Sequence, residues 1–137
     1  MKVALDTNVV LDLLLNRAPF ADAATAIFHQ IEAGEYPACV CATTITTLHY
    51  IAHKVVGDVA ARQHIGQLLT LLELAPVDHT VIAHALRSPL KDFEDAVLAQ
   101  SAYAVGAQAI ITRNGTDFRD GPLQVYSPQE WLNQPHH

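Results

Sequence analysis

Residues 2–12 read KVALDTNVVLD. The apolar run up to Leu5 has the length of a short buried strand and ends on an acid, Asp6, while the segment from Asn8 to Asn16 has the apolar spacing of a helix. A short strand that runs directly into a helix is typical of folds in which strands and helices alternate along the chain. This opening therefore predicts an α/β protein whose first strand carries a carboxylate at its end.

The same alternation continues along the chain. Further apolar strands are predicted at 38–42, 74–77, 109–112 and 124–126. Helices are predicted at 21–33, 44–56, 58–72, 80–88, 92–105 and from 128 onward, where SPQE at 127–130 is a helix-start signature. Thr43 or Thr44 is the expected cap of the helix after the second strand. This order predicts one three-layer α/β/α domain over residues 1–137, with a short parallel sheet in the middle.

The amino-acid composition excludes several classes of protein. The 137 residues are half hydrophobic and only 16% charged, which fits one compact domain and excludes a disordered acidic chain. No apolar run reaches the ~20 residues of a membrane span, and the opening residues meet Asp6 too soon for a secretory signal. Cys39 and Cys41 point to the same side of a strand and are too close for an ordinary disulfide. We expect a cytoplasmic protein in which both cysteines are small buried side chains.

Acidic residues stand beside the predicted strand ends. In a parallel sheet flanked by helices, the functional site lies at the carboxyl ends of the strands, near a reversal of strand order. Asp6 ends the first strand, Asp117 follows the fourth, and Asp95 lies at the start of the helix that leads into the fourth. Crowded carboxylates repel one another, and the usual compensation is Mg²⁺ or Mn²⁺, which can activate a water for attack on a phosphodiester. The pattern predicts that the three acids converge in one concave site.

Each of these acids also has a purely structural interpretation. Asp6 can cap the first helix, and Asp92, Glu94 and Asp95 lie in a first turn, where the helix dipole favours negative charge. Residues 96–105, however, are apolar on nearly every face, which indicates a buried helix. A carboxylate at the start of a buried helix needs a partner, and this favours the functional interpretation.

Several segments, taken in this order, resemble the PIN-domain family. They are LDTNVVLD at 5–12, DFEDA at 92–96, ITRN at 111–114 with Asp117-Phe118 after it, and SPQEW at 127–131, which is similar to the ending of bacterial members. The resemblance covers essentially the whole chain. It implies a metal-dependent ribonuclease fold, often found as the toxin of a VapBC-type toxin–antitoxin pair.

The resemblance also implies roles for individual residues. The acids that would gather around Mg²⁺ or Mn²⁺ are Asp6, Asp95 and Asp117. The positions that hydrogen-bond the acids or a metal-bound water in the family are matched by Asn8, Thr112 and Asn114.

One position departs from the family pattern. Most catalytic PIN domains carry a Glu in the helix after the second strand, where this chain has Thr47. A hydroxyl can bind a metal's water but brings no negative charge. We therefore expect a lower metal affinity unless Asp92 or Glu94 takes part.

Basic residues are few but are placed near the acids. The chain has 8 Lys and Arg against 14 Asp and Glu, a net charge of −6, which argues against indiscriminate binding to nucleic acid. Arg17, Arg113 and Arg119 are expected to border the acidic pocket and, with His49, to contact RNA. Asp12 is expected to pair with Arg17 or Arg113 and to take no part in the chemistry.

The eight histidines do not predict a zinc site. His49 and His53 have the four-residue spacing of a helical metal pair, but no third ligand accompanies them. Solvated or hydrogen-bonded histidines are the expected state.

The sequence thus favours a PIN-type, Mg²⁺- or Mn²⁺-dependent ribonuclease acting on RNA. The resemblance implies a small antitoxin partner and a homodimer, for which the apolar helices over 21–31 and 46–72 are candidate surfaces. One alternative is a non-catalytic PIN-fold module that binds RNA or a protein, suggested by Thr47. Another is a small phosphohydrolase with Asp6 as nucleophile, although that chemistry generally needs a second Asp where the chain has Asn8.

Overall fold

A single parallel sheet organises the chain, as the sequence predicted. The computed structural model describes residues 1–135, and His136 and His137 lie outside the described residues. The sheet order is β3-β2-β1-β4-β5, and β1 pairs with both β2 and β4. The strands are β1 (Val3–Leu5), β2 (Ala38–Cys41), β3 (Glu73–Ala75), β4 (Ala109–Ile111) and β5 (Gln124–Tyr126). The strand order therefore reverses at the β1–β4 pair, and this places the most favourable site for a ligand there.

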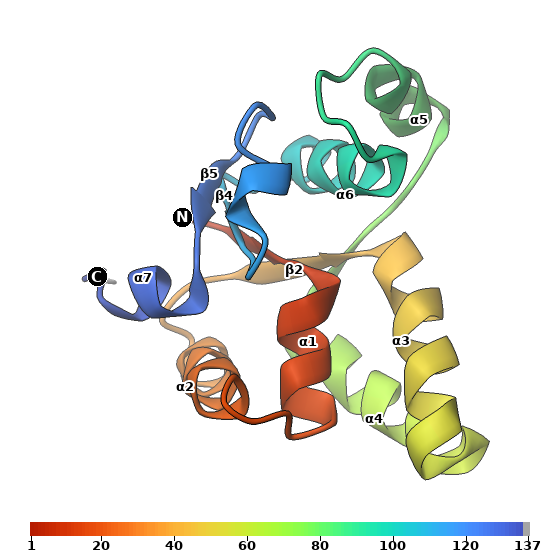
Figure 1. Cartoon of the computed structure of the whole chain (residues 1–137), viewed down its shortest axis with the longest axis vertical. Helices are drawn as coiled ribbons and strands as arrows, with labels where there is room; N and C mark the ends of the chain where they lie inside the picture. The colour runs from red at the N-terminus through yellow and green to blue at the C-terminus, as the bar shows by residue number, and fades with distance from the viewer. Residues whose placement is uncertain (136–137) are drawn as a thin grey trace.

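Helices cover both faces of the sheet and make the three predicted layers (Figure 1). They are α1 (Thr7–Leu14), α2 (Ala21–Glu32), α3 (Ala42–Val56), α4 (Asp58–Leu71), α5 (His79–Leu86), α6 (Phe93–Ala104) and α7 (Pro128–Leu132). One face packs against α1 to α4 and α7, and the other packs against α5 and α6. Within residues 1–135, none of the helices has the length and apolar character that crossing a bilayer requires.

The two faces follow from the alternation of side chains along each strand. Val3 and Leu5 join the core beneath α1 to α4, whereas Ala4 joins the core beneath α5 and α6. Cys39 and Cys41 lie on the same side as Ala4, and both are free and buried, as predicted. Burial raises the pKa of the Cys39 thiol to about 12.

Two predicted element boundaries were wrong. We expected Thr43 or Thr44 to cap the helix after β2, but α3 begins at Ala42, because both hydroxyls have other partners. Thr43 Oγ1 contacts Cys41 Sγ at 3.2 Å, and Thr44 Oγ1 contacts Thr7 Oγ1 at 3.1 Å. The strand predicted at 74–77 spans Glu73–Ala75 and ends before Pro76, which has no N–H to donate to a neighbouring strand.

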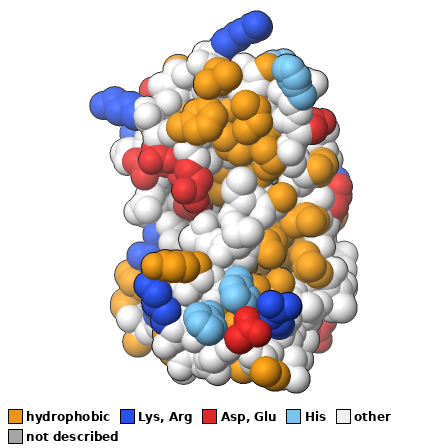
Figure 2. Space-filling model, turned by 90° about the vertical axis from the view of Figure 1, so that its right-hand side faces the viewer, with side chains coloured by type: hydrophobic (Ala, Val, Ile, Leu, Met, Phe, Trp, Pro, Cys, Tyr) orange, Lys and Arg blue, Asp and Glu red, His pale blue; other side chains and the backbone are white. Residues whose placement is uncertain are grey.

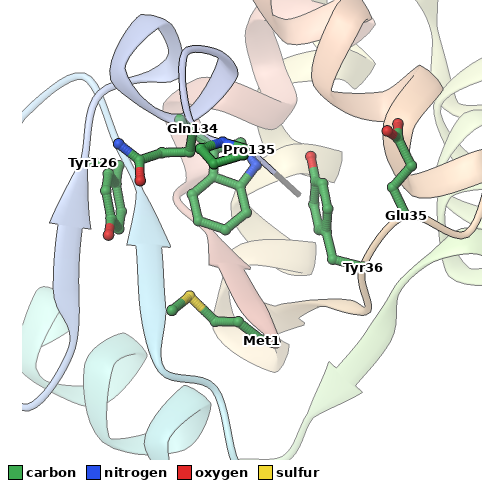
Figure 3. Close-up of a pocket in the computed structure, with 7 residues that line it drawn as sticks. Met1, Glu35, Tyr36, Tyr126, Gln134 and Pro135 are labelled. Carbon is green, nitrogen blue, oxygen red and sulfur yellow. The ribbon is translucent and has the colours of Figure 1, made fainter. Parts of the chain in front are cut away.

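The short helix α7 is fixed to the domain by a cap and by one aromatic side chain. Ser127 and Glu130 form the predicted capping box, with Ser127 Oγ accepting from Glu130 N at 3.0 Å and Glu130 Oε1 accepting from Ser127 N at 2.8 Å. Trp131 is only 2% exposed and meets the rings of Tyr36 and Tyr126 edge-on, with centroids 5.1 and 5.3 Å away. Figure 3 shows Tyr36 and Tyr126 on opposite sides of the small cavity at this junction.

We expect Trp131→Ala to lower the free energy of unfolding by about 3–5 kcal/mol, because the change empties a buried aromatic position. Urea unfolding followed by far-UV circular dichroism measures the loss. Leu86→Ala is the matched control, since Leu86 is 71% exposed and should change stability little. A loss below about 1 kcal/mol for Trp131→Ala would show that α7 is not part of the cooperative unit.

Candidate functional site

The site lies where β1 and β4 end side by side. Asp6 follows β1 and Thr112 follows β4. Although they are 106 residues apart in sequence, Thr112 Oγ1 donates a 2.7 Å hydrogen bond to Asp6 Oδ2. Both side chains are buried, with Asp6 8% and Thr112 1% exposed. The reversal of strand order therefore brings Asp6, a predicted metal ligand, into contact with Thr112, a predicted supporting residue.

Asp6 is held by hydrogen bonds on both carboxylate oxygens. Oδ1 accepts from Thr7 N at 2.7 Å, so Asp6 also caps α1, and Oδ2 accepts from Asn8 Nδ2 at 3.2 Å as well as from Thr112. Burial raises the pKa of Asp6 above its ordinary value, the hydrogen bonds from Thr112 and Thr7 oppose the rise, and the charges of Asp117 and Glu94 add to it. The structural and the functional interpretations of this acid are thus compatible.

Asp95 is the second acid of the site. It lies in the first turn of α6, whose cap is Asp92, with Asp92 Oδ1 accepting from Asp95 N at 2.9 Å. Burial is the largest cause that raises the pKa of the Asp95 carboxyl, followed by the charges of Asp92, Asp6, Asp117 and Glu94 in that order, and together they bring it to about 7. The pKa of this carboxyl is therefore raised by every other predicted acid of the site.

Asp117 comes from a short 3₁₀ turn, Gly115–Asp117, just after β4. It is exposed, and it lines a hollow of about 500 Å³ together with Asp92 and Asp95. Asp120 lines the same hollow and was missed by the sequence analysis, because no strand end or helix start marks its position. The remaining walls are Pro89, Leu90, Lys91 and Thr116.

The acids lie within electrostatic range of one another but do not form a finished metal site. Among residues 1–135, no three His, Cys, Asp or Glu side chains are arranged to hold an ion as they stand. Figure 2 shows acidic side chains gathered in one group on the face it presents. Of the predicted acids, Asp6 is fixed by its hydrogen bonds, whereas Asp92, Glu94 and Asp117 are exposed and Asp95 is partly buried.

The supporting residues connect the two strand ends. Asn8 Nδ2 donates to Asp6, and Asn8 Oδ1 accepts from Arg113 N at 3.4 Å. Asn114 contributes its backbone N–H, which donates to Thr112 Oγ1 at 2.9 Å. Thr112 can therefore accept from the loop while it donates to Asp6, and this fixes the direction of its hydroxyl.

Asp12 binds both of the arginines that the sequence offered as alternatives. Its carboxylate is 1% exposed and accepts from Arg17 Nε at 3.0 Å and from Arg113 Nε at 2.8 Å. Arg113 Nη2 adds a bond of 3.2 Å to the same carboxylate, and Arg17 Nη2 reaches the Asn8 carbonyl at 3.3 Å. We call Asp12, Arg17 and Arg113 the arginine triad. It joins α1 to the loop after β4.

Three other predicted residues have local partners. Thr47 Oγ1 donates to the Thr43 carbonyl at 3.3 Å within α3. His49 Nε2 lies 2.8 Å from Asp58 Oδ1 of α4, and the His49 ring stacks with the ring of His53. The exposed Arg119 lies near enough to Glu130 to help lower the pKa of that carboxyl, after the larger effect of the Ser127 cap.

A family model described as the PIN domain matches residues 2–116. The chain belongs to the PIN-domain family. No curated protein matches the sequence.

Several solved structures match the fold of this chain over nearly its whole length. The toxin–antitoxin complex from Klebsiella pneumoniae is 23% identical, with a TM-score of 0.69 over 92% of this chain and 97% of that one. The VapBC–DNA complex from Salmonella typhimurium is 18% identical, with a TM-score of 0.71 over 93% and 98%. FitAcB from Neisseria gonorrhoeae is 18% identical, with a TM-score of 0.73 over 93% and 98%. Because the sequence identities are low, the structural similarity confirms the fold of this PIN domain and nothing beyond it.

The raised pKa of Asp95 makes the stability of this PIN domain depend on pH. An unfolded Asp titrates near pH 4 and the folded one near 7, so the folded state binds more protons between these values and loses stability as the pH rises through them. We expect Asp95→Asn to remove this loss. The gain, discounted because solvent screens a partly exposed carboxyl, is about 1–2 kcal/mol at pH 8.

Urea unfolding from pH 5 to pH 8 measures the effect, and the gap between the two proteins should grow up to pH 7 and then level off. Asp22→Asn is the matched control, because Asp22 is an exposed acid in the first turn of α2. A gain that does not change with pH would contradict the assignment.

Proposed function

We propose that this PIN domain is a divalent-metal-dependent ribonuclease that hydrolyses RNA phosphodiester bonds. The observation that carries the proposal is that three acids from distant segments lie near one another, since Asp6 and Asp117 are close enough to Asp95 for their charges to raise its pKa. Acids that repel one another at a strand-order reversal are typical of sites that hold a cation. PIN domains are typically nucleases, and this agrees with the proposal.

The donors available at the site fit Mg²⁺ or Mn²⁺. They are carboxylate, hydroxyl and amide oxygens, the hard ligands that these ions prefer, and the described part of the site offers no thiol or imidazole. Asp6, Asp95 and Asp117 would hold the ion. Because Asp6 is fixed by its hydrogen bonds, binding would require the side chains of Asp95 and Asp117 to turn toward it.

When bound, the ion would supply a polarised water and neutralise charge on the phosphodiester. The residues of the chain have separate tasks. Thr112 and Asn8 orient the Asp6 carboxylate, and Asn114 N–H orients Thr112 in turn. Asp92 caps α6 and so fixes the backbone from which Asp95 projects.

A toxin role is proposed from the comparisons. The similar structures include complexes of toxins with their antitoxins. A corresponding antitoxin would find an apolar groove between α1, α2 and α4, of about 350 Å³, lined by Leu13, Leu14, Phe28, Leu68 and Leu71 among others. The proposal also includes a homodimer of this chain, as the family resemblance implies.

The second candidate is a PIN-fold module that binds RNA without cleaving it. Thr47 favours it, because this hydroxyl replaces the Glu of most catalytic members and bonds within its own helix. The phosphohydrolase alternative loses support, since both oxygens of Asp6 already accept hydrogen bonds and the carboxylate is buried.

Cleavage of a labelled RNA in Mn²⁺ is the direct test of the first candidate. We expect Asp6→Asn, Asp95→Asn and Asp117→Asn each to reduce the rate by more than ~100-fold, and Thr112→Val to reduce it by about 10–100-fold, the usual effect of losing an orienting partner. Asp58→Asn, an exposed acid of the α3–α4 pair, is the control and should leave the rate unchanged. Wild-type protein that binds RNA but does not cleave it would favour the binding module.

Thr47→Glu should strengthen Mn²⁺ binding by about tenfold, because it adds the negative charge that most catalytic PIN domains carry at this position. Isothermal titration calorimetry measures the affinity. Thr46→Glu adds the same charge at the exposed neighbouring position and serves as the matched control. Equal affinities for the two variants would mean that position 47 does not face the metal.

A further inference from the structure

We propose that the arginine triad and the hollow beside it form a nucleotide subsite for the RNA strand. In this subsite Arg17 and Arg113 contact a phosphate, and the ring of Phe20 packs against the base. The inference rests on the proposed function, since it concerns the substrate of the same site. It adds a second contact region, on the other side of the loop after β4.

The charge of the triad favours an anion. Two guanidinium groups share one carboxylate, so the cluster carries one net positive charge in a chain whose net charge is −6. Asp12 is buried, whereas the side chains of Arg17 and Arg113 are 37% and 26% exposed. The two arginine side chains are therefore partly open to solvent while their shared counter-ion is not.

The carboxylate also holds the two arginines in place. Arg113 makes two bonds to Asp12, and Arg17 bonds both Asp12 and the Asn8 carbonyl. Each guanidinium has five N–H donors, so donors remain for a ligand after these bonds are made. Side chains fixed in this way lose little conformational entropy when they bind phosphate.

A hollow of about 440 Å³ adjoins Arg113 and has room for one nucleotide. Its walls include Pro19, Phe20, Ala23, Pro128 and Gln129, from the α1–α2 loop, α2 and the start of α7. The Arg113 guanidinium lies over the Phe20 ring, 3.9 Å from its centroid, and Phe20 is 40% exposed. A half-exposed aromatic ring beside a fixed cation is the combination on which single-stranded nucleic acids stack.

Hydrogen bonds connect the subsite to the acidic site. Arg113 directly follows Thr112, whose hydroxyl donates to Asp6. Arg113 N also donates to Asn8, which in turn donates to Asp6. The loop after β4 therefore carries residues of both regions, and an RNA strand that contacts this loop could reach both.

Binding without cleavage is the suitable test. The parent protein carries Asp6→Asn, the buffer contains EDTA, and the anisotropy of a labelled single-stranded RNA is measured over a series of salt concentrations. Arg17→Gln should lower the slope of log affinity against log salt by about 0.7, the value for one phosphate contact of a single strand. Arg17→Lys should restore most of the slope, because it retains the charge.

Matched variants separate the two parts of the subsite. Arg62→Gln removes an exposed arginine that is paired with Asp58 and should leave the slope unchanged. Phe20→Ala should weaken binding roughly tenfold without altering the slope, since stacking is not a counter-ion effect. Tyr103→Ala removes an aromatic ring of similar exposure on α6 and should have no effect.

The outcomes distinguish this inference from the proposed function. RNA binding by the parent with the same slope for Arg17→Gln overturns the subsite and leaves the nuclease proposal intact. Equal losses for Arg17→Gln and Arg17→Lys indicate a purely structural triad and also overturn it. No binding by the parent at any salt concentration also overturns the subsite, and cleavage of RNA by the wild type in Mn²⁺ then decides the nuclease proposal separately. A poly-glutamate peptide that binds as tightly as RNA, and as dependently on Arg17, assigns the triad to acidic protein segments and overturns the RNA subsite.

Discussion

A carboxylate buried at the end of a strand must be satisfied by its surroundings, and the way in which Asp6 is satisfied sets the geometry of the site. Its partners come from the first turn of α1 and from the end of β4, and the bond from Thr112 can form only when β1 and β4 are neighbours. The same pairing is the point at which the strand order reverses. The order of the strands therefore sets where Asp6 and Thr112 meet.

Around this fixed carboxylate the molecule separates its charges. Negative charge is concentrated toward α6, in the hollow lined by Asp92, Asp95 and Asp117. Positive charge is held on the α1 side, where Arg17 and Arg113 surround Asp12. The loop after β4 supplies Thr112 and Asp117 to the acids and Arg113 to the triad. A phosphate chain that crosses this loop would pass from an acidic region to a basic one.

Much of the fold and of the acidic site could be predicted, because the ends of the strands can be recognised in the sequence. The apolar runs before Asp6 and Thr112 locate the edge of the sheet, and the apolar helix after Asp95 indicates that this acid lies at a buried boundary. The sequence named Arg17 and Arg113 as alternative partners of Asp12, but it could not show that both bind the same carboxylate. Arg113 is 101 residues away, and spacing along the chain does not tell how many side chains meet at one point in the fold. The start of α3 was misplaced for a similar reason. Thr44 has the residue type of a cap, but its hydroxyl is bound to Thr7 across the fold.

The two cysteines of β2 have a practical consequence. Both lie beneath the layer made by α5 and α6, the same layer that carries Asp95, and burial keeps the Cys39 thiol protonated at neutral pH. Thiolates, not thiols, react with alkylating reagents, so native protein should resist chemical labelling at Cys39. Wherever that layer detaches, the cysteines become reactive. The chain thus carries its own built-in reporter of local opening beside the acidic site, readable by mass spectrometry without any added probe.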